Sequence, residues 1–311
     1  MRGEFSFLSA DGKTRIHGVS WTPAGEPRFV LQLVHGMVEF IDRYDGFARY
    51  LAERGVLVAG HDHLGHGDSV TDRSEWGYMG DANPSGILVE DMHAVRVRMQ
   101  KEHPGLPYFM LGHSMGSYLL RKYLTLHGEG LAGAIVTGTG DVAPAVASFG
   151  SALCTLIGKT RGWHHRSPAL ARLAMGGGAY RQFDATGAEP ERSWMTRDTE
   201  IVRRYYDEPR CTFLFTASGY KALMETVAFD GKAANIAAIP HDLPILLVSG
   251  ECDPVGDLGE GVKRVDAKMR AAGLKDVTLK LWPEDRHEVL NELNREEVYA
   301  DLLAWMEAKL P

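Results

Sequence analysis

The sequence predicts an α/β protein in which a mostly parallel central sheet carries helices on both faces and one helical insertion. Three observations predict this fold. Short apolar runs of strand length alternate with helical stretches along most of the chain. Three candidate catalytic side chains each follow one of these runs, where such sheets gather their functional groups. The alternation is interrupted once, between residues 141 and 241, in a chain of 311 residues that is long enough for one large domain with an insertion.

The first half of the chain begins with a predicted antiparallel hairpin and continues with strands and helices in turn. The pair Asp11-Gly12 favours the tight turn of the hairpin. The two strands after the hairpin are nearly continuous apolar runs, as expected of strands buried on both faces. The predicted elements of this half are hairpin strands 4–8 and 15–21, strands 29–34 and 55–60, and helices 43–53 and 85–103.

The next apolar run, which begins at Tyr108, ends in a sharp turn that contains a serine. Gly112-His113-Ser114-Met115-Gly116 lies between this run and a helical stretch, which is the setting of a nucleophile elbow. In such a turn the serine backbone is strained, and the flanking glycines allow the strand and helix to approach closely. An ordinary strand-to-helix turn is the alternative. Because a serine hydroxyl is a poor nucleophile at neutral pH, Ser114 needs a base, an acid and an oxyanion hole.

After the apolar run 132–136 the pattern changes to helical stretches broken by glycine and proline, Gly176-Gly177-Gly178 included. We expect residues 141–241 to form a helical cap (lid) and residues 1–140 and 242–311 to form the core. Apolar residues of the first cap helix are predicted to line an acyl-chain tunnel, the alternative being that they only pack the cap onto the core. These residues are Phe149, Leu153 and Ile157.

A small basic cluster, residues 161–166, follows this first cap helix. We interpret it as a solvated surface, with contact to a phosphate headgroup as the alternative.

Two further apolar runs follow the insertion, and each ends shortly before a candidate partner for Ser114. Asp253 follows the first run, at 244–250, and His287 follows the second, at 277–282. The order Ser, Asp, His is that of the α/β-hydrolase fold. We predict that His287 removes the serine proton and that Asp253 orients its imidazole.

The acid and the oxyanion hole have further candidates. Asp257 is the alternative acid, whereas His241 and Asp242 precede a strand and therefore belong at the opposite edge of the sheet. The amide after the nucleophile, that of Met115, is predicted to donate to the oxyanion, together with the amide of Met37 after an earlier strand.

Composition excludes several function classes. A formal net charge of -7 argues against nucleic-acid binding, which relies on clustered Lys and Arg. The three cysteines show neither metal-type spacing nor a disulfide framework, and His61, His63 and His66 lie in a loop without matching ligands elsewhere. We therefore expect no metal and no cofactor. Without a leader-like segment or a long apolar stretch, we expect a soluble, cytoplasmic protein.

Several segments together resemble the α/β hydrolases of the monoacylglycerol lipase and lysophospholipase type. They are His35-Gly36-Met37-Val38-Glu39 with Arg43-Tyr44, the stretch from Asp62 to Ser69, His103-Pro104-Gly105-Leu106-Pro107 before the elbow, and His287-Glu288 with Asn291-Glu292. The resemblance implies a serine hydrolase that cleaves esters of a single acyl chain through an acyl-enzyme. It also implies a helical cap and the same triad and oxyanion residues. Met37 is bulkier than the small residue common there, so the pocket is expected to be narrower.

Other functions stay open, because a fold alone does not define a reaction. The alternatives are an amidase or aminopeptidase, a thioesterase, a cofactor-free haloperoxidase, or a binding module without turnover. We expect a small-molecule or lipid ester as the partner, with transient contact of the cap with a membrane surface. The natural substrate and the oligomeric state do not follow from the sequence.

Overall fold

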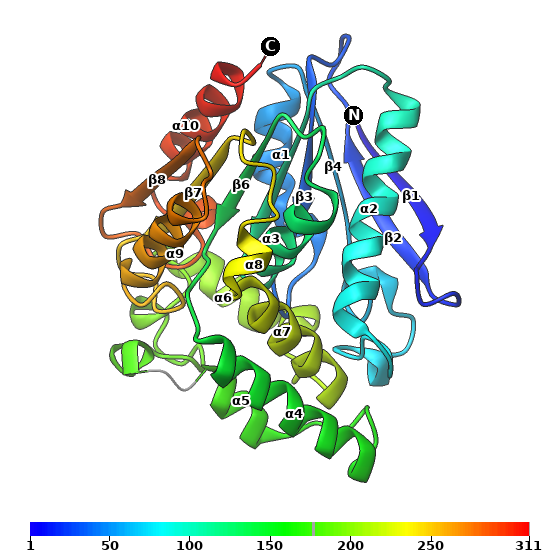
Figure 1. Ribbon diagram of the computed structural model, residues 1–311, viewed down its shortest axis with the longest axis vertical. Helices are drawn as coiled ribbons and strands as arrows, with labels where there is room; N and C mark the ends of the chain where they lie inside the picture. The colour runs from blue at the N-terminus through cyan, green and yellow to red at the C-terminus, as the bar shows by residue number, and fades with distance from the viewer. Residues whose placement is uncertain (176–177, 311) are drawn as a thin grey trace.

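The structure is a computed structural model that describes residues 1–175 and 178–310. Among these residues, eight strands form one sheet in the order β1-β2-β4-β3-β5-β6-β7-β8 (Figure 1). β1–β2 and β2–β4 pair antiparallel, and all later neighbours pair in parallel. The strands are β1 (Arg2–Leu8), β2 (Arg15–Trp21), β3 (Phe29–Val34), β4 (Val56–His61), β5 (Tyr108–His113), β6 (Gly133–Thr137), β7 (Ile245–Gly250) and β8 (Val277–Trp282). The mostly parallel α/β sheet predicted from the sequence is confirmed.

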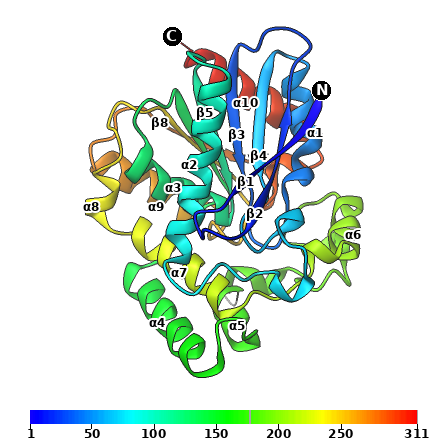
Figure 2. The same cartoon turned by 90° about the vertical axis from the view of Figure 1, so that its right-hand side faces the viewer.

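The central strands are buried because helices cover both faces of the sheet. Every residue of β3, β4, β5, β6 and β7 is buried, as their continuous apolar sequences require. One apolar core includes side chains of α2, α3 and α9, and the other includes side chains of α1 and α10 on the opposite face (Figures 1 and 2). These helices are α1 (Asp45–Ala52), α2 (Pro84–Glu102), α3 (Met115–His127), α9 (Glu260–Ala271) and α10 (Arg295–Ala308).

The chain between β6 and β7 is helical, as predicted, and lies beyond the carboxyl ends of the parallel strands (Figure 1). Its helices are α4 (Pro144–Arg161), α5 (Pro168–Met175), α6 (Thr199–Asp207), α7 (Ala217–Asp230) and α8 (Ala233–Ile236). α4 packs along α7, α7 also contacts α2 and α3, and α8 contacts α3 and α9. Of the predicted glycine break, Gly176 and Gly177 lie outside the described residues.

The last helices before β7, α7 and α8, therefore also pack against the core.

In the described ranges no helix combines the length and the apolar character needed to cross a bilayer.

Candidate active site

Ser114 lies in a strained turn between β5 and α3. Its φ of 53° and ψ of -120° fall where side chains other than glycine seldom go. The Ser114 amide donates to the carbonyl of Thr137 on neighbouring β6 at 3.0 Å. A Cβ at Gly116 would overlap the carbonyl oxygen of Val34 on β3, so only glycine fits there. The sequence pattern thus produces the sharp turn that was expected of it.

His287 and Asp253 come together at the same edge of the sheet, from the loops after β8 and β7. The imidazole Nδ1 lies 3.0 Å from both carboxylate oxygens, and both side chains are almost fully buried. The Ser249 hydroxyl and the Val255 amide also donate to Asp253, at 3.1 and 2.8 Å. These donors hold the carboxylate toward His287, which is the geometry that orients a general base.

The rival acid and histidine lie elsewhere. Asp257 is exposed and pairs with Arg264 at 3.0 Å. Asp242 is exposed and pairs with Lys275, while His241 bonds the carbonyl of Ala237. Among the candidates, only Asp253 contacts His287.

Met37 and Met115, the predicted oxyanion residues, both line the same cavity as Ser114 and His287. Met115 begins α3, and the first amides of a helix have no partner within it. The loop of Met37 lies against the elbow, since a Cβ at Gly36 would come 3.0 Å from that of Ser114. Both residues therefore lie near Ser114, and the role of their amides as oxyanion donors stays a prediction.

Two histidines beside Ser114 differ in charge behaviour. Burial by itself lowers the pKa of His287. The charge and hydrogen bond of Asp253, together with the charge of Glu288, raise this pKa by more than burial lowers it, so that it lies above its ordinary value. Burial lowers the pKa of His113 to about 3, and its Nδ1 lies 3.0 Å from the Thr137 hydroxyl. The rings are 4.7 Å apart. His113 is therefore neutral at pH 7 and does not add charge next to the base.

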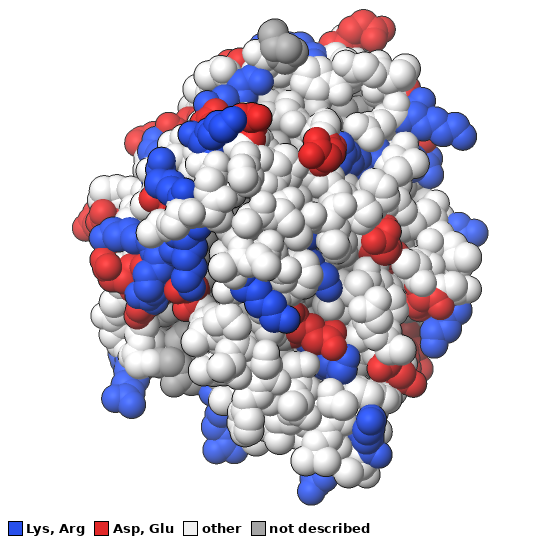
Figure 3. Space-filling model, viewed as in Figure 1, with Lys and Arg blue, Asp and Glu red and all other residues white. Residues whose placement is uncertain are grey.

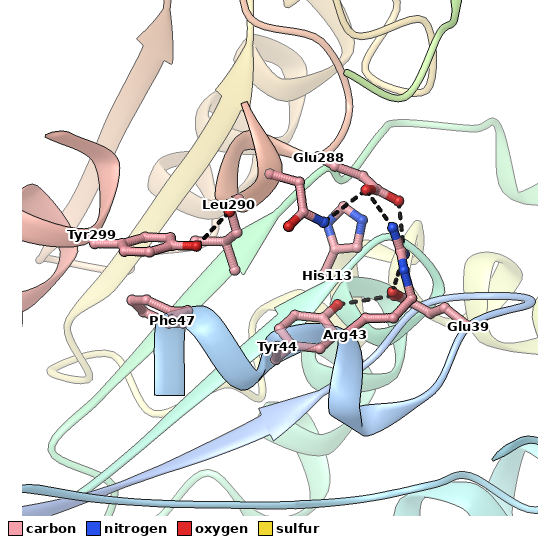
Figure 4. Close-up of a pocket in the computed structure, with 9 residues that line it drawn as sticks. Glu39, Arg43, Tyr44, Phe47, His113, Glu288, Leu290 and Tyr299 are labelled. Carbon is pink, nitrogen blue, oxygen red and sulfur yellow. Dashed lines mark hydrogen bonds and ion pairs between the residues drawn. The ribbon is translucent and has the colours of Figure 1, made fainter. Parts of the chain in front are cut away.

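Arg43 joins the oxyanion loop to the loop of His287. Its guanidinium donates to Glu288 at 2.9 and 2.7 Å and to Glu39 at 2.7 Å, as Figure 4 shows. Glu39 in turn accepts from the Gly36 amide and, at 2.9 Å, from the Tyr44 hydroxyl. Burial alone would raise the pKa of Glu288, but Arg43 lowers it, so that Glu288 stays ionised. The motif residues around positions 35–44 and 287–288 thus form one buried network.

The loop after β4 forms a network of internal hydrogen bonds. Asp62 accepts from the amides of Ile41 and Asp68 at 2.7 and 2.9 Å and contacts His17 at 2.9 Å. His63 and His66 are buried and bond backbone groups of the same region. The residues of this loop do not line the described cavity, but the loop supports Val38, which does, because the Val38 amide donates to His66 at 3.3 Å.

A cavity of about 740 Å³ extends from Ser114 and His287 into the insertion. Its walls from the insertion are mostly apolar and come from the start of α4, from α5, from the segment 180–195, from α6, from the segment before α7 and from α7 itself. They include Val142, Val146, Ala147, Gly150, Ala171, Phe213, Leu214, Tyr220, Leu223, Met224 and Val227.

The predicted acyl-chain tunnel has to be corrected. Its residues Phe149, Leu153 and Ile157 are not among the described residues that line this cavity. Leu153 and Ile157 pack against the core, and Phe149 is 68% exposed. α4 presents a different face to the cavity than the one expected.

The basic cluster that follows α4 contacts the core. Arg166 donates to the carbonyls of Leu214 and Ser74, and His164 pairs with Glu75 while stacking on Tyr78.

Sequence reasoning missed three residues of the insertion that lie near His287. The Trp194 indole is 5.0 Å from the imidazole, and the Tyr180 ring is 5.6 Å from Trp194. Arg197 forms ion pairs with Asp285 and Glu292 on either side of His287. No local pattern marks Trp194 or Arg197, because their partners in the 285–292 loop are about ninety positions away along the chain.

The chain matches known proteins over nearly its full length. It is 28% identical over 309 residues to a monoacylglycerol lipase of Mycolicibacterium smegmatis, covering 99% of this chain and 98% of that one. It is 26% identical to the human monoglyceride lipase, covering 92% and 84%. A carboxyl esterase of Bacillus coagulans superposes with a TM-score of 0.89 at 31% identity, covering 99% and 98%.

A family model described as serine aminopeptidase, S33, matches residues 25–294. Together with the esterase and lipase relatives, this match places the chain among the carboxylic ester hydrolases of the α/β-hydrolase fold. The chain belongs to the serine aminopeptidase S33 family.

Proposed function

We propose that this protein hydrolyses monoacylglycerols and similar esters of one acyl chain, with Ser114 as the nucleophile. The observation that carries the proposal is the mostly apolar cavity that ends at Ser114 and His287. An apolar cavity of this kind favours an acyl chain by about 0.8 kcal/mol for each methylene buried. The monoacylglycerol lipases among the relatives support the same substrate class.

In this mechanism His287 takes the proton of the Ser114 hydroxyl while the oxygen attacks the ester carbonyl. The amides of Met37 and Met115 stabilise the oxyanion. The tetrahedral intermediate expels the alcohol, which receives the proton from His287, and leaves an acyl group on Ser114. Water, deprotonated by His287, then attacks the acyl-enzyme. The bond to the Ser114 oxygen breaks, that oxygen takes the proton back from His287, and the fatty acid is released. Asp253 stabilises the imidazolium in both steps.

Residues 141–241 act as the cap in this proposal, and they supply the acyl-chain wall. α4 carries three exposed apolar side chains, Val146 at the rim of the cavity and Phe149 and Leu156 outside it, at 58–68% exposure. This end of the molecule is largely uncharged at its surface, with Lys and Arg at its edge (Figure 3). These features support transient contact with a lipid surface, from which the substrate enters. Co-sedimentation with phosphatidylcholine vesicles, weakened by Phe149→Ser, tests this part. The cytoplasmic location expected from the sequence remains a prediction.

The substrate class is tested by kinetics on four sets of compounds. These are monoacylglycerols of increasing chain length, p-nitrophenyl esters of the same chains, aminoacyl p-nitroanilides, and acyl-CoA thioesters. We expect kcat/KM to be highest for the esters and to rise with chain length until the cavity is filled. Preference for the anilides or the thioesters would contradict the proposal.

A further inference from the structure

The segment Ser193–Arg197 of the insertion runs beside the loop that carries His287. The Glu288 amide donates to the carbonyl of Met195 at 2.7 Å, and the His287 amide donates to that of Trp194 at 3.4 Å. The Thr196 hydroxyl donates to the carbonyl of Asn291 at 2.9 Å. The amide of the histidine and two backbone groups that follow it are thus bonded to a segment that belongs to the cap and not to the sheet.

Arg197 adds a charged anchor at the same place. Its Nη2 lies 2.6 Å from Asp285 and its Nε lies 3.0 Å from Glu292, while its own amide donates to Glu292 at 3.2 Å. Both carboxylates are fully buried, and they precede and follow His287 by two and five residues. Burial and the nearby charge of Glu292 raise the pKa of Asp285 to about 6. Two buried acids this close need a cation, and Arg197 contacts both of them.

Trp194 completes the contact from the insertion side. Its indole is 5.0 Å from the imidazole of His287, which also lies 4.7 Å from the ring of His113. The base therefore packs against one ring of the core and one ring of the insertion. Ring packing and backbone bonds together limit how far the imidazole can move relative to Ser114.

We propose that Arg197 is a positioning residue for His287, and that through it the cap contributes to the chemical step as well as to substrate choice. The inference rests on the proposed role of His287 as the base. Because Arg197 is not among the described residues that line the cavity, it acts on the base through the 285–292 loop and not through substrate contact.

The proposal is tested with Arg197→Gln and Arg197→Lys, beside Arg204→Gln as a matched control. Arg204 lies on nearby α6, is 71% exposed and, within the described part of the chain, forms its ion pair with Glu200 at the surface. kcat and KM are measured for a p-nitrophenyl acetate and a long-chain ester. The rate of phosphonylation by diisopropyl fluorophosphate is measured as well, since this small reagent needs the serine and its base but not the acyl-chain wall.

A displaced base lowers kcat on the order of a hundredfold, as small misplacements of catalytic groups do. We expect Arg197→Gln to lower kcat by about this factor on both esters and to slow phosphonylation equally, with little change in KM. Arg197→Lys keeps the charge but cannot bridge both carboxylates, so we expect a smaller loss of the same kind. Arg204→Gln should behave as the wild type.

Arg197→Gln leaves two buried acids without a cation, and this variant can fail to fold for that reason. In that case the proposal is tested with Arg197→Lys alone. Wild-type kcat and phosphonylation in a folded Arg197 variant would overturn the proposal. A loss limited to the long-chain ester would also overturn it, because it would indicate a substrate wall. Ser114→Ala distinguishes failure of the proposed function from failure of the Arg197 proposal. If that variant still hydrolyses esters, the proposed function fails irrespective of Arg197.

Discussion

At the scale of residues, the account depends on the pairing of His287 with Asp253. Asp253→Asn keeps the shape of the side chain but favours the wrong imidazole tautomer, so we expect kcat to fall by a factor of about ten thousand. Asp257, exposed and paired with Arg264, provides the matched control. Asp257→Asn should leave kcat unchanged, and a larger loss in that variant would show that the acid is assigned wrongly.

The same pair predicts a pH profile. The general base must be neutral, and Asp253 keeps the pKa of His287 above its ordinary value of 6.5. kcat/KM should therefore rise with pH along a limb centred above 6.5. Without the carboxylate charge, burial dominates and the pKa falls, so the limb of Asp253→Asn should move to lower pH. A limb that stays in place or moves to higher pH would contradict this electrostatic account.

The residues that sequence analysis found differ in kind from those it missed. Ser114, Asp253 and His287 each follow an apolar strand, and parallel strands bring their carboxyl ends to one edge. Trp194 and Arg197 follow no strand, and their partners are set by how the insertion folds back on the core. Such long-range pairs leave no local pattern in a single sequence.

At the scale of elements, the elbow depends on Gly112 and Gly116, which permit the close approach of β3, β5 and α3. A Cβ at Gly116 would overlap backbone carbonyls of β3, which cannot move without disturbing the sheet. We expect Gly116→Ala to cost about 3 kcal/mol of unfolding free energy, the upper end for overpacked cores. A Cβ at Gly25 would meet open space, so Gly25→Ala is the control.

Equilibrium unfolding in urea measures both changes. Equal stability of the two variants would mean that the elbow has room that the structure does not show.

Strands and core helices were predictable because their patterns are local. β3 and β8 have the predicted bounds, and α2 begins and ends within one residue of prediction. The first helix differs, since Ile41–Tyr44 form a 3-10 turn and α1 begins only at Asp45. The face that α4 presents to the cavity could not be predicted, because Phe149 is as apolar as the residues that face inward. Packing on α7 decides the orientation.

At the scale of the whole molecule, the core and the insertion share the cavity, so substrate length should depend on the insertion's lining. Leu223 and Met224 on α7 line the cavity, whereas exposed Phe149 does not. Leu223→Asn and Met224→Gln should lower kcat/KM for a long-chain ester by on the order of tenfold, the value of one buried apolar side chain, and leave an acetate ester nearly unchanged.

Phe149→Gln is the control, measured with monomeric substrates below the concentration at which they form micelles. Equal losses on both esters in the α7 variants would mean that these residues only support the insertion. A selective loss in Phe149→Gln would restore the tunnel that the sequence suggested.

The central claim is that Ser114 is the nucleophile of an ester hydrolase. The most direct test is to treat the protein with a fluorophosphonate and locate the adduct by peptide mass, beside ester turnover of Ser114→Ala. The account predicts one adduct on the peptide that contains Ser114, lost activity in proportion to labelling, and a folded Ser114→Ala protein whose turnover is about a million-fold lower. An adduct on another residue with Ser114 unmodified, or wild-type turnover by folded Ser114→Ala, would contradict it.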